Sequence, residues 1–249
     1  MIVEKKFSFK ILILLINIFV LKFSFSQESI DYSISASLLS ETDQLIIKQK
    51  IRFVNQSDSL ENIYLNDWAN SYSSTKSPLA DRLVEEYTRS FYLSAKSKRG
   101  NTLISNIYIN GFKAKWKRKQ NNLDIIEINV DKPINKGIVN IDLSYIVKLP
   151  SSKFTGYGKI KKNQYFIENF FITLSKFLKN KQILNSNLDL EEIPINESKF
   201  SIDLRIDKNL DVFSSLNLKN FESENGEVLY TFQSNKIKQV MFLIGDDLN

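Results

Sequence analysis

The sequence predicts a mainly β protein, a curved antiparallel sheet or β-sandwich of roughly ten or more strands with one inserted helix. Apolar and polar residues alternate with a period of two along most of the chain, as in half-buried strands. Turn signals such as Asn110-Gly111 separate the alternating runs at short spacing. The composition is 43% hydrophobic and 25% charged, which lies in the range of globular domains. Many short strands with close turns are typical of a sandwich or an open curved sheet.

The first 26 residues have the layout of a secretory signal peptide. Three lysines precede an apolar run over 11–21, and small residues follow at Ser24 and Ser26, ahead of a cleavage point before Gln27. The apolar run is much shorter than the roughly 20 residues that span a bilayer. Cleavage is therefore favoured over the alternative of an uncleaved membrane anchor, and no cysteine follows the run to carry a lipid.

Cleavage would leave one domain over 27–249 in the periplasm or outside the cell, with no transmembrane span. The segment 1–26 carries four lysines and one glutamate, so its removal lowers the formal net charge from +6 to +3. A residual charge of this size does not favour nucleic acid as a partner. The absence of cysteine in an exported chain suits a bacterial envelope protein better than a small eukaryotic secreted domain.

The alternating runs after residue 27 place the strands. We expect them at 30–38, 47–53, 107–109, 112–116, 126–130, 139–147, 200–206, 228–232 and 240–244. One segment has a helical spacing instead: Ser77 can cap a helix whose first residue is Pro78, and the apolar residues that follow predict a helix over 78–92. The stretch 177–193 has no steady period and is predicted to be an excursion or loop.

The residue inventory argues against an enzyme. The chain has no histidine and no cysteine, which excludes Ser-His and Cys-His nucleophile pairs, disulfides and zinc sites built from these residues. Glycine-rich phosphate loops are also absent. A hydrolase that uses two carboxylates is the least favoured hypothesis, because nothing in the sequence places two acids across a cleft.

Two further clusters have structural interpretations. In the basic stretch 113–119 the lysines at 113, 115 and 117 fall on one side of a strand, which favours a solvated outer face over a nucleic-acid site. The aromatic cluster of Tyr165, Phe166, Phe170 and Phe171 is more typical of a core than of a ligand cage.

A set of segments suggests a family. In chain order they are Asp31–Ile34, Ile51–Asn55, Ile63–Ser73, Ser77–Arg82, Arg99–Thr102 and Leu149–Gly158, followed by an aromatic strand at Tyr165–Thr173, the stretch Leu188–Leu190 and a strand at Lys199–Ile206. This ordered set resembles the N-terminal β domain of aminopeptidase N-like zinc metallopeptidases (gluzincins) of the bacterial envelope. The resemblance covers nearly all of residues 30–245.

The resemblance implies a module without chemistry of its own. The family holds its zinc with H-E-x-x-H and a downstream Glu, and grips the amino end of its substrate with a G-x-M-E-N loop. This chain has neither motif. We therefore expect no catalytic residue, no metal, no cofactor and no peptidase activity. The implied role is to pack on the catalytic domain and form one wall of its substrate cleft, so the expected partner is such a domain or another envelope protein.

One binding position carries over from the family. In many relatives a Gln in a T-Q-W-like strand contacts the first residue of the substrate. The stretch 167–171 matches it here, with Asn169 in the Gln position and Phe170 in the Trp position. Asn169 is one methylene shorter, and the alternative is a strand residue without a ligand. The alternative function is a stand-alone exported β-sandwich that serves as a binding or scaffold module of the envelope.

Overall fold

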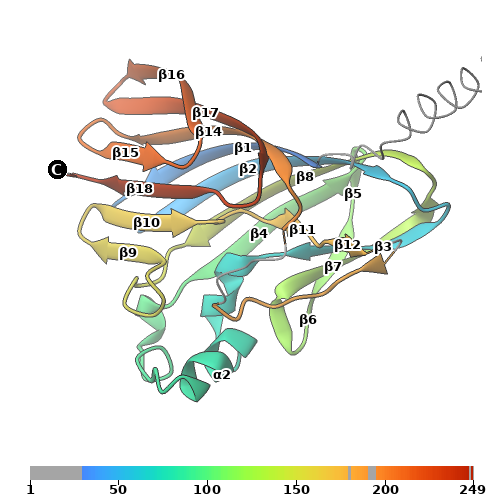
Figure 1. Cartoon of the computed structure of the whole chain (residues 1–249), viewed down its shortest axis with the longest axis horizontal. Helices are drawn as coiled ribbons and strands as arrows, with labels where there is room; N and C mark the ends of the chain where they lie inside the picture. The colour runs from blue at the N-terminus through green and yellow to red at the C-terminus, as the bar shows by residue number, and fades with distance from the viewer. Residues whose placement is uncertain (1–29, 179–180, 190–194, 247, 249) are drawn as a thin grey trace, which may run out of the picture.

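The computed structural model describes residues 30–178, 181–189, 195–246 and 248, and strands make up most of them (Figure 1). The predicted mainly β class is confirmed. The predicted signal segment 1–26 lies outside the described residues. Among the residues that the structure describes, no helix has the length and apolar character needed to cross a membrane.

The largest part of the described fold is an eight-stranded sheet. Its strands, from edge to edge, are β16 (Asn217–Glu224), β17 (Glu227–Ile237), β14 (Ser198–Asp207), β1 (Ile30–Leu39), β2 (Gln44–Asn55), β8 (Gly137–Lys148), β4 (Asn101–Ile109) and β5 (Phe112–Lys113). The pairing is antiparallel, as predicted, except between β1 and β14, where Ile30 pairs with Ser198 in parallel register.

One face of the large sheet is covered and the other faces solvent. On β8 every second residue is buried, from Val139 to Val147, and the residues between them are partly exposed. β1 and β2 alternate in the same way. This is the period-two pattern of the sequence, which therefore located the covered face as well as the strands.

Two smaller sheets lie against the covered face (Figure 1). We call them the β10 sheet and the β7 sheet. The β10 sheet consists of β15 (Asp211–Ser214), β18 (Met241–Gly245), β10 (Gln164–Glu168) and β9 (Gly158–Lys161). The β7 sheet consists of β11 (Thr173–Leu174), β3 (Leu60–Asn66), β7 (Asn122–Ile134) and β6 (Lys115–Lys119). The expected two-layer arrangement is thus built with a divided second layer.

Buried tyrosines connect the layers. The Tyr145 hydroxyl donates to Gln49 Oε1 and accepts from the backbone nitrogen of Ile172 at 3.1 Å. Gln49 Nε2 donates to the carbonyl oxygen of Ile172 at 2.6 Å. The Tyr32 hydroxyl accepts from the nitrogen of Leu174 in the same way, at 3.1 Å. These bonds satisfy both backbone groups of Ile172, which lies between β10 and β11, and the nitrogen of Leu174 in β11.

The helical insertion is shorter than the sequence predicted. Helix α2 (Pro78–Glu85) begins as expected, with Ser77 Oγ accepting from the nitrogen of Ala80 at 3.2 Å. It ends because Tyr87 adopts a left-handed conformation, with φ 62°. Phe91 is fully buried but lies in the loop after the helix, so the expected extent to residue 92 is wrong. The remaining helical turns are η1 (Trp68–Ser73) and η2 (Lys96–Lys98).

The stretch predicted as a loop at 177–193 is mostly irregular. It begins with the antiparallel pair β12 (Phe177–Leu178) and β13 (Lys181–Gln182). Residues 183–189 then have no regular structure, and 179–180 and 190–193 lie outside the described residues.

Candidate functional site

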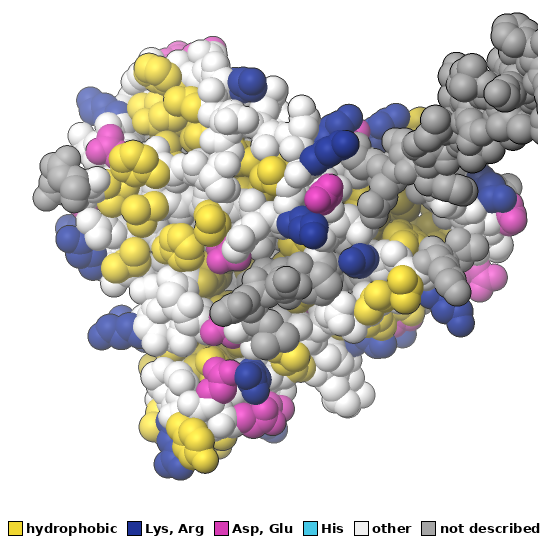
Figure 2. Space-filling model, viewed as in Figure 1, with side chains coloured by type: hydrophobic (Ala, Val, Ile, Leu, Met, Phe, Trp, Pro, Cys, Tyr) yellow, Lys and Arg dark blue, Asp and Glu magenta, His cyan; other side chains and the backbone are white. Residues whose placement is uncertain are grey.

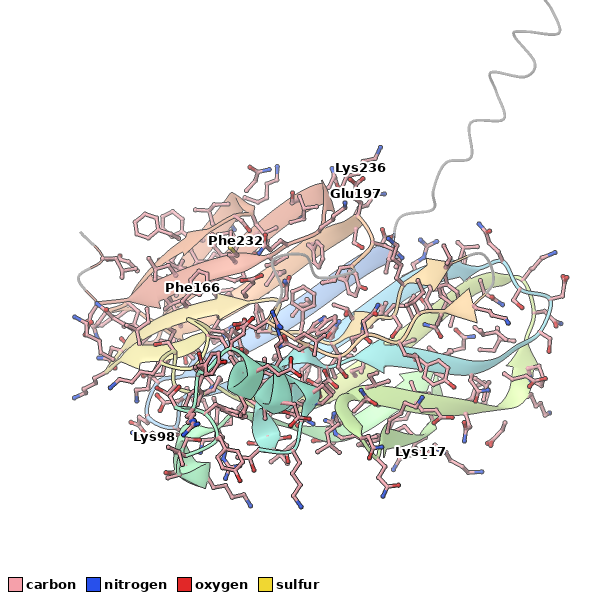
Figure 3. The ribbon with its side chains drawn as sticks, turned by 60° about the horizontal axis from the view of Figure 1, so that its bottom comes forward. Lys98, Lys117, Phe166, Glu197, Phe232 and Lys236 are labelled. Carbon is pink, nitrogen blue, oxygen red and sulfur yellow. The ribbon has the colours of Figure 1, made fainter. Side chains whose placement is uncertain are left out.

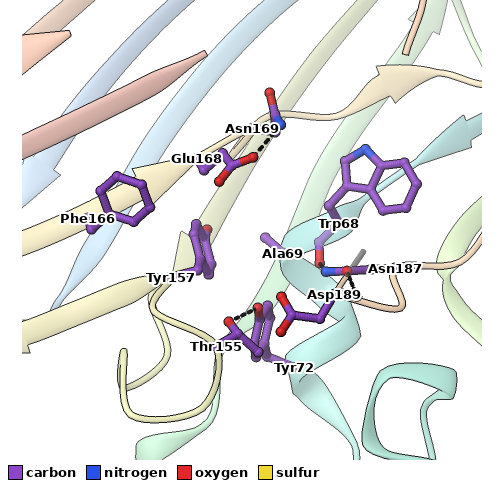
Figure 4. A pocket seen from close by; sticks show the side chains of 10 residues that line it. All are labelled: Trp68, Ala69, Tyr72, Thr155, Tyr157, Phe166, Glu168, Asn169, Asn187 and Asp189. Carbon is purple, nitrogen blue, oxygen red and sulfur yellow. Dashed lines mark hydrogen bonds between the residues drawn. The ribbon is translucent and has the colours of Figure 1, made fainter. Parts of the chain in front are cut away.

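A pocket of about 90 Å³ lies where the end of β10 meets the turn η1 and the loop that follows β13 (Figure 4). Its lining includes Trp68 and Tyr72 of η1, Tyr157 just before β9, Glu168 at the end of β10, and Asp189 in the loop. These residues are far apart in the sequence, so the fold is what brings them together.

Asn169, the predicted binding residue, lines this pocket and also holds the backbone of Val240 in place. Its backbone nitrogen donates to the oxygen of Val240 at 3.0 Å, and its Oδ1 accepts from the nitrogen of Val240 at 3.1 Å. Its φ is 41°, a left-handed conformation that Asn adopts more readily than most residues. The amide oxygen is therefore engaged in holding the start of β18. The Nδ2 donates to the adjacent Glu168 Oε1 at 3.3 Å.

Buried polar contacts fix the turn η1. Asp67 precedes it and is 2% exposed. The Asp67 carboxylate accepts from Arg118 Nη2 at 2.8 Å and from Thr102 Oγ1 at 2.8 Å. Asn70 Oδ1 accepts from the nitrogen of Thr102 at 3.1 Å. These bonds tie η1 to β4 and β6, so Trp68 and Tyr72 are held at defined places in the pocket wall.

A second carboxylate anchors the loop that carries Asp189. Asp124 accepts from the nitrogen of Asn187 at 2.7 Å and from Ser186 Oγ at 2.9 Å. Asn187 Oδ1 in turn accepts from the nitrogen of Asp189 at 3.0 Å. Burial raises the pKa of Asp124 above its ordinary value, and the bonds from Asn187 and Ser186 oppose that rise.

Stacked tyrosines form the aromatic wall. The rings of Tyr72 and Tyr157 are 5.4 Å apart and nearly parallel. The Tyr72 hydroxyl lies 2.5 Å from Thr155 Oγ1 (Figure 4). Burial raises the pKa of both tyrosine hydroxyls above the ordinary value.

The pocket carries negative charge without a matching positive charge. Glu168 and Asp189 line it, and none of the described lining residues is Lys or Arg. Partial burial raises the pKa of Asp189, and the charges of Glu86 and Glu168 raise it further. Glu168 accepts from the amides of Asn169 and Gln239, which are neutral donors. A bound cation would relieve this repulsion.

Two polar atoms of the wall have no partner within the described part of the chain. They are Trp68 Nε1 and the hydroxyl oxygen of Tyr157, on side chains that are 5% and 9% exposed as residues. Buried polar atoms without a partner are rare, and each one invites an explanation. The lining also offers two carboxylates and aromatic faces. This set suits an ammonium or guanidinium group.

An apolar row crosses the outer face of the β10 sheet beside the pocket. Phe213 pairs with Leu243, and Leu243 pairs with Phe166, so the three side chains lie on one face. Phe213 is 58% exposed, and the other two are partly exposed. Figure 2 shows hydrophobic side chains gathered over this part of the molecule, and Figure 3 labels Phe166 on β10. Phe166 also lines the pocket.

Asn169, which the family resemblance suggested, is among the residues that line this pocket. The sequence correctly placed Phe170 and Phe171 in the core. Phe166, predicted to be core, is instead partly exposed. Tyr72, Tyr157 and Asp189 were not predicted as site residues. They lie in turns and a loop, where no regular alternation of apolar and polar residues indicates which way a side chain points.

The sequence matches no protein-family model, and no curated protein sequence is significantly similar to it. Solved structures are similar in fold. An M1 zinc metallopeptidase from Deinococcus radiodurans aligns with a TM-score of 0.50 and 12% identity, over 88% of this chain and 42% of that one. A mutant two-domain M1 zinc metallopeptidase bound to L-arginine aligns with a TM-score of 0.51 and 12% identity, over 87% of this chain and 42% of that one.

A further mutant of the two-domain type, bound to L-tryptophan, aligns with a TM-score of 0.50 and 14% identity, over 88% and 43%. The chain thus spans less than half the length of the enzymes it matches. The expected resemblance to the β domain of this family is confirmed at the level of fold.

The described residues do not fit the zinc of those enzymes. No three His, Cys, Asp or Glu side chains come together as a metal site in the part of the chain that the structure covers. The sequence also lacks the histidines from which catalytic zinc sites of this kind are built.

Proposed function

We propose that the chain is a non-catalytic module that packs against a peptidase catalytic domain outside these 249 residues and forms one wall of its substrate cleft. The protein would be exported and would act in the periplasm or outside the cell. The single observation that supports this is the position of Phe166. It belongs to the exposed apolar row of the β10 sheet and also to the lining of the pocket. A domain seated on the row would therefore close over the pocket.

In this proposal the pocket receives the cationic amino end of a peptide. Glu168 and Asp189 would pair with the ammonium group, and the rings of Tyr72 and Tyr157 would form the aromatic wall beside it. Asn169 would contribute its Nδ2, since its oxygen is engaged by Val240. These roles agree with the family resemblance and with the charge of the lining.

Amino-acid amides test the pocket directly. We expect L-leucine amide to bind the purified chain in isothermal titration, because its ammonium group can meet both carboxylates. N-acetyl-leucine amide lacks that charge and should bind at least about tenfold more weakly. Asp189→Asn should weaken binding of L-leucine amide, whereas Asp58→Asn, on an exposed loop, should not. Equal binding of the charged and the acetylated amide would exclude the cation site.

The docking role is tested with a catalytic domain bearing H-E-x-x-H from the same genome. We expect a complex in light scattering, and we expect Phe213→Asp to weaken it about tenfold or more because it places a charge in the apolar row. Phe221→Asp is the matched control: this residue is 63% exposed on β16, away from the row. Equal effects of the two substitutions would contradict docking at the β10 sheet.

The absence of chemistry is tested on the chain alone. We expect the purified protein to retain no zinc after equilibrium dialysis and to leave aminoacyl-anilides uncleaved. Retention of zinc together with cleavage would show that the chain is an enzyme.

The alternative is a stand-alone envelope module that binds a ligand without a catalytic domain. The observation that favours it is that this chain itself supplies both carboxylates and the stacked tyrosines of the pocket. Binding of L-leucine amide to the isolated protein, combined with no complex with any catalytic domain, would support this alternative.

A further inference from the structure

A second cavity lies at the opposite end of the molecule from the β10 sheet, beside β5 and β7, which are on the right in Figure 1. The chain passes here from one layer to the other. Phe112 pairs with Ile109 in the large sheet, whereas Lys115 pairs with Asn129 in the β7 sheet. Ala114 lies between them, and its nitrogen donates to the oxygen of Ile107 at 2.9 Å. The cavity occupies the angle between the two sheets.

Apolar side chains line the inside of this cavity. Ile109 is buried, and Ala114, Val130 and Ile134 are partly buried and pack against the core. Phe112 also lines it and is 80% exposed. The volume is about 470 Å³, within the range of roughly 300–1,000 Å³ that is typical of ligand pockets. The hydrophobic core is therefore open to solvent at this end.

The charged residues of the lining leave a positive surplus. Three lysines and one acid belong to it, namely Lys113, Lys115, Lys132 and Asp131. Lys115 Nζ pairs with Asp131 Oδ1 at 3.1 Å. Neither Lys113 nor Lys132 forms an ion pair within the described residues. Lys113 and Lys132 therefore leave the lining with unpaired positive charge.

We propose that this cavity binds a single unbranched acyl chain that ends in a carboxylate. The hydrocarbon chain lies between the two sheets, against Ile109, Val130 and Ile134, and the carboxylate pairs with Lys113 and Lys132. This occupant satisfies both features at once, because it removes the apolar lining from water and supplies the missing negative charge. The site is distinct from the pocket at β10 and does not depend on the proposed docking role.

The shape of the site favours a single free fatty acid over a membrane surface as the ligand. The apolar lining is recessed between two sheets and has the volume of a small ligand site, and Phe112 is the lining apolar residue that is largely exposed. Insertion into a bilayer would instead need a broad projecting apolar surface.

Competition with a fluorescent fatty acid tests the proposal. Dansyl-undecanoate should gain fluorescence with the purified chain, and dodecanoate, below its micelle concentration, should displace it with a stoichiometry of one. Each methylene added from octanoate to dodecanoate should tighten binding about fourfold. Dodecyltrimethylammonium, which has the same chain and the opposite charge, should bind at least about tenfold more weakly.

Two variants locate the site. Ala114→Trp fills the cavity and should abolish displacement, and Lys132→Glu should weaken dodecanoate about tenfold or more. Lys161→Glu, on β9, is the matched control and should bind as the wild type does. Circular dichroism and thermal unfolding establish that each variant is folded; if Ala114→Trp does not fold, the comparison of Lys132→Glu with Lys161→Glu decides.

Three results would overturn the proposal. The first is equal binding of dodecanoate and dodecyltrimethylammonium. The second is unchanged affinity in folded Lys132→Glu. The third is binding of the protein to vesicles of anionic phospholipid with no displacement of dansyl-undecanoate by dodecanoate, which would assign the same surface to a membrane.

Discussion

The carboxylate of Asp124 accepts a 2.7 Å hydrogen bond from the backbone nitrogen of Asn187, 63 positions later in the sequence. This bond, with that from Ser186, attaches the loop bearing Asp189 to the β7 sheet. The shape of the pocket at β10 therefore depends on a residue that does not line it.

Asp124→Ala should loosen this loop. Two donors would lose their acceptor, and we expect the free energy of unfolding to fall by about 1–3 kcal/mol. Hydrogen exchange should also speed up at residues 186–189. Asp58→Ala is the control, because the ion pair of Asp58 with Lys136 is exposed and its loss should cost less than about 0.5 kcal/mol. Equal losses in the two variants would contradict the anchoring role.

The raised pKa of Asp124 predicts a pH dependence. Because the folded protein binds this proton more tightly than the unfolded chain, the free energy of unfolding should rise as the pH falls from neutral through the raised pKa. The contribution is lost again as the pH rises through that pKa. The free energy of unfolding, measured with urea at several pH values between about 4 and 7, should therefore change more steeply with pH in the wild type than in Asp124→Asn. Asp189 titrates in both proteins, so its effect cancels. Parallel slopes would disprove the assignment to Asp124.

Arg118→Met should be among the most damaging substitutions. It leaves Asp67, which is 2% exposed, as a buried charge without its cation. We expect a loss of about 3–5 kcal/mol in urea unfolding. Adding Asp67→Asn should restore part of that loss, since it removes the unpaired charge. Lys136→Met is the exposed control, and a similar loss there would show that the burial of the pair is irrelevant.

Two glycines beside the pocket offer a matched comparison. A methyl group on Gly158, where φ is 112°, would lie 2.1 Å from the oxygen of Pro150. On Gly156, where φ is 89°, it would meet nothing within 4 Å. Gly156→Ala should cost about 1–2 kcal/mol for its backbone conformation alone. Gly158→Ala should cost clearly more or prevent folding, as judged by thermal unfolding, and a smaller cost at Gly158 would refute the close packing against Pro150.

The sequence predicted most of the fold because burial on one face leaves a period of two. The alternation from Val139 to Val147 gave both the position of β8 and its buried side. The parallel pairing of β1 with β14 was not predicted, since strand alternation says nothing about which strands become neighbours. The end of α2 was predicted wrongly because of Phe91. This residue lies in the loop after the helix, but it is buried and its spacing from Leu83 and Tyr87 is that of a helix.

The site was harder to predict than the fold. Asn169 was identified only through the family resemblance, and the structure shows that its oxygen serves the backbone of Val240. Tyr157 and Asp189 face the pocket because of local turns. The bonds that place them, such as that between Asp124 and Asn187, join residues whose proximity no local pattern encodes.

The parallel pairing of Ile30 with Ser198 also constrains the order of folding. During synthesis β1 emerges early, whereas β14, which covers one of its edges, emerges only after most of the chain. That edge stays open in the meantime and can pair with other chains. Holding factors that bind unfolded polypeptides would therefore protect this edge of β1 until β14 has been made.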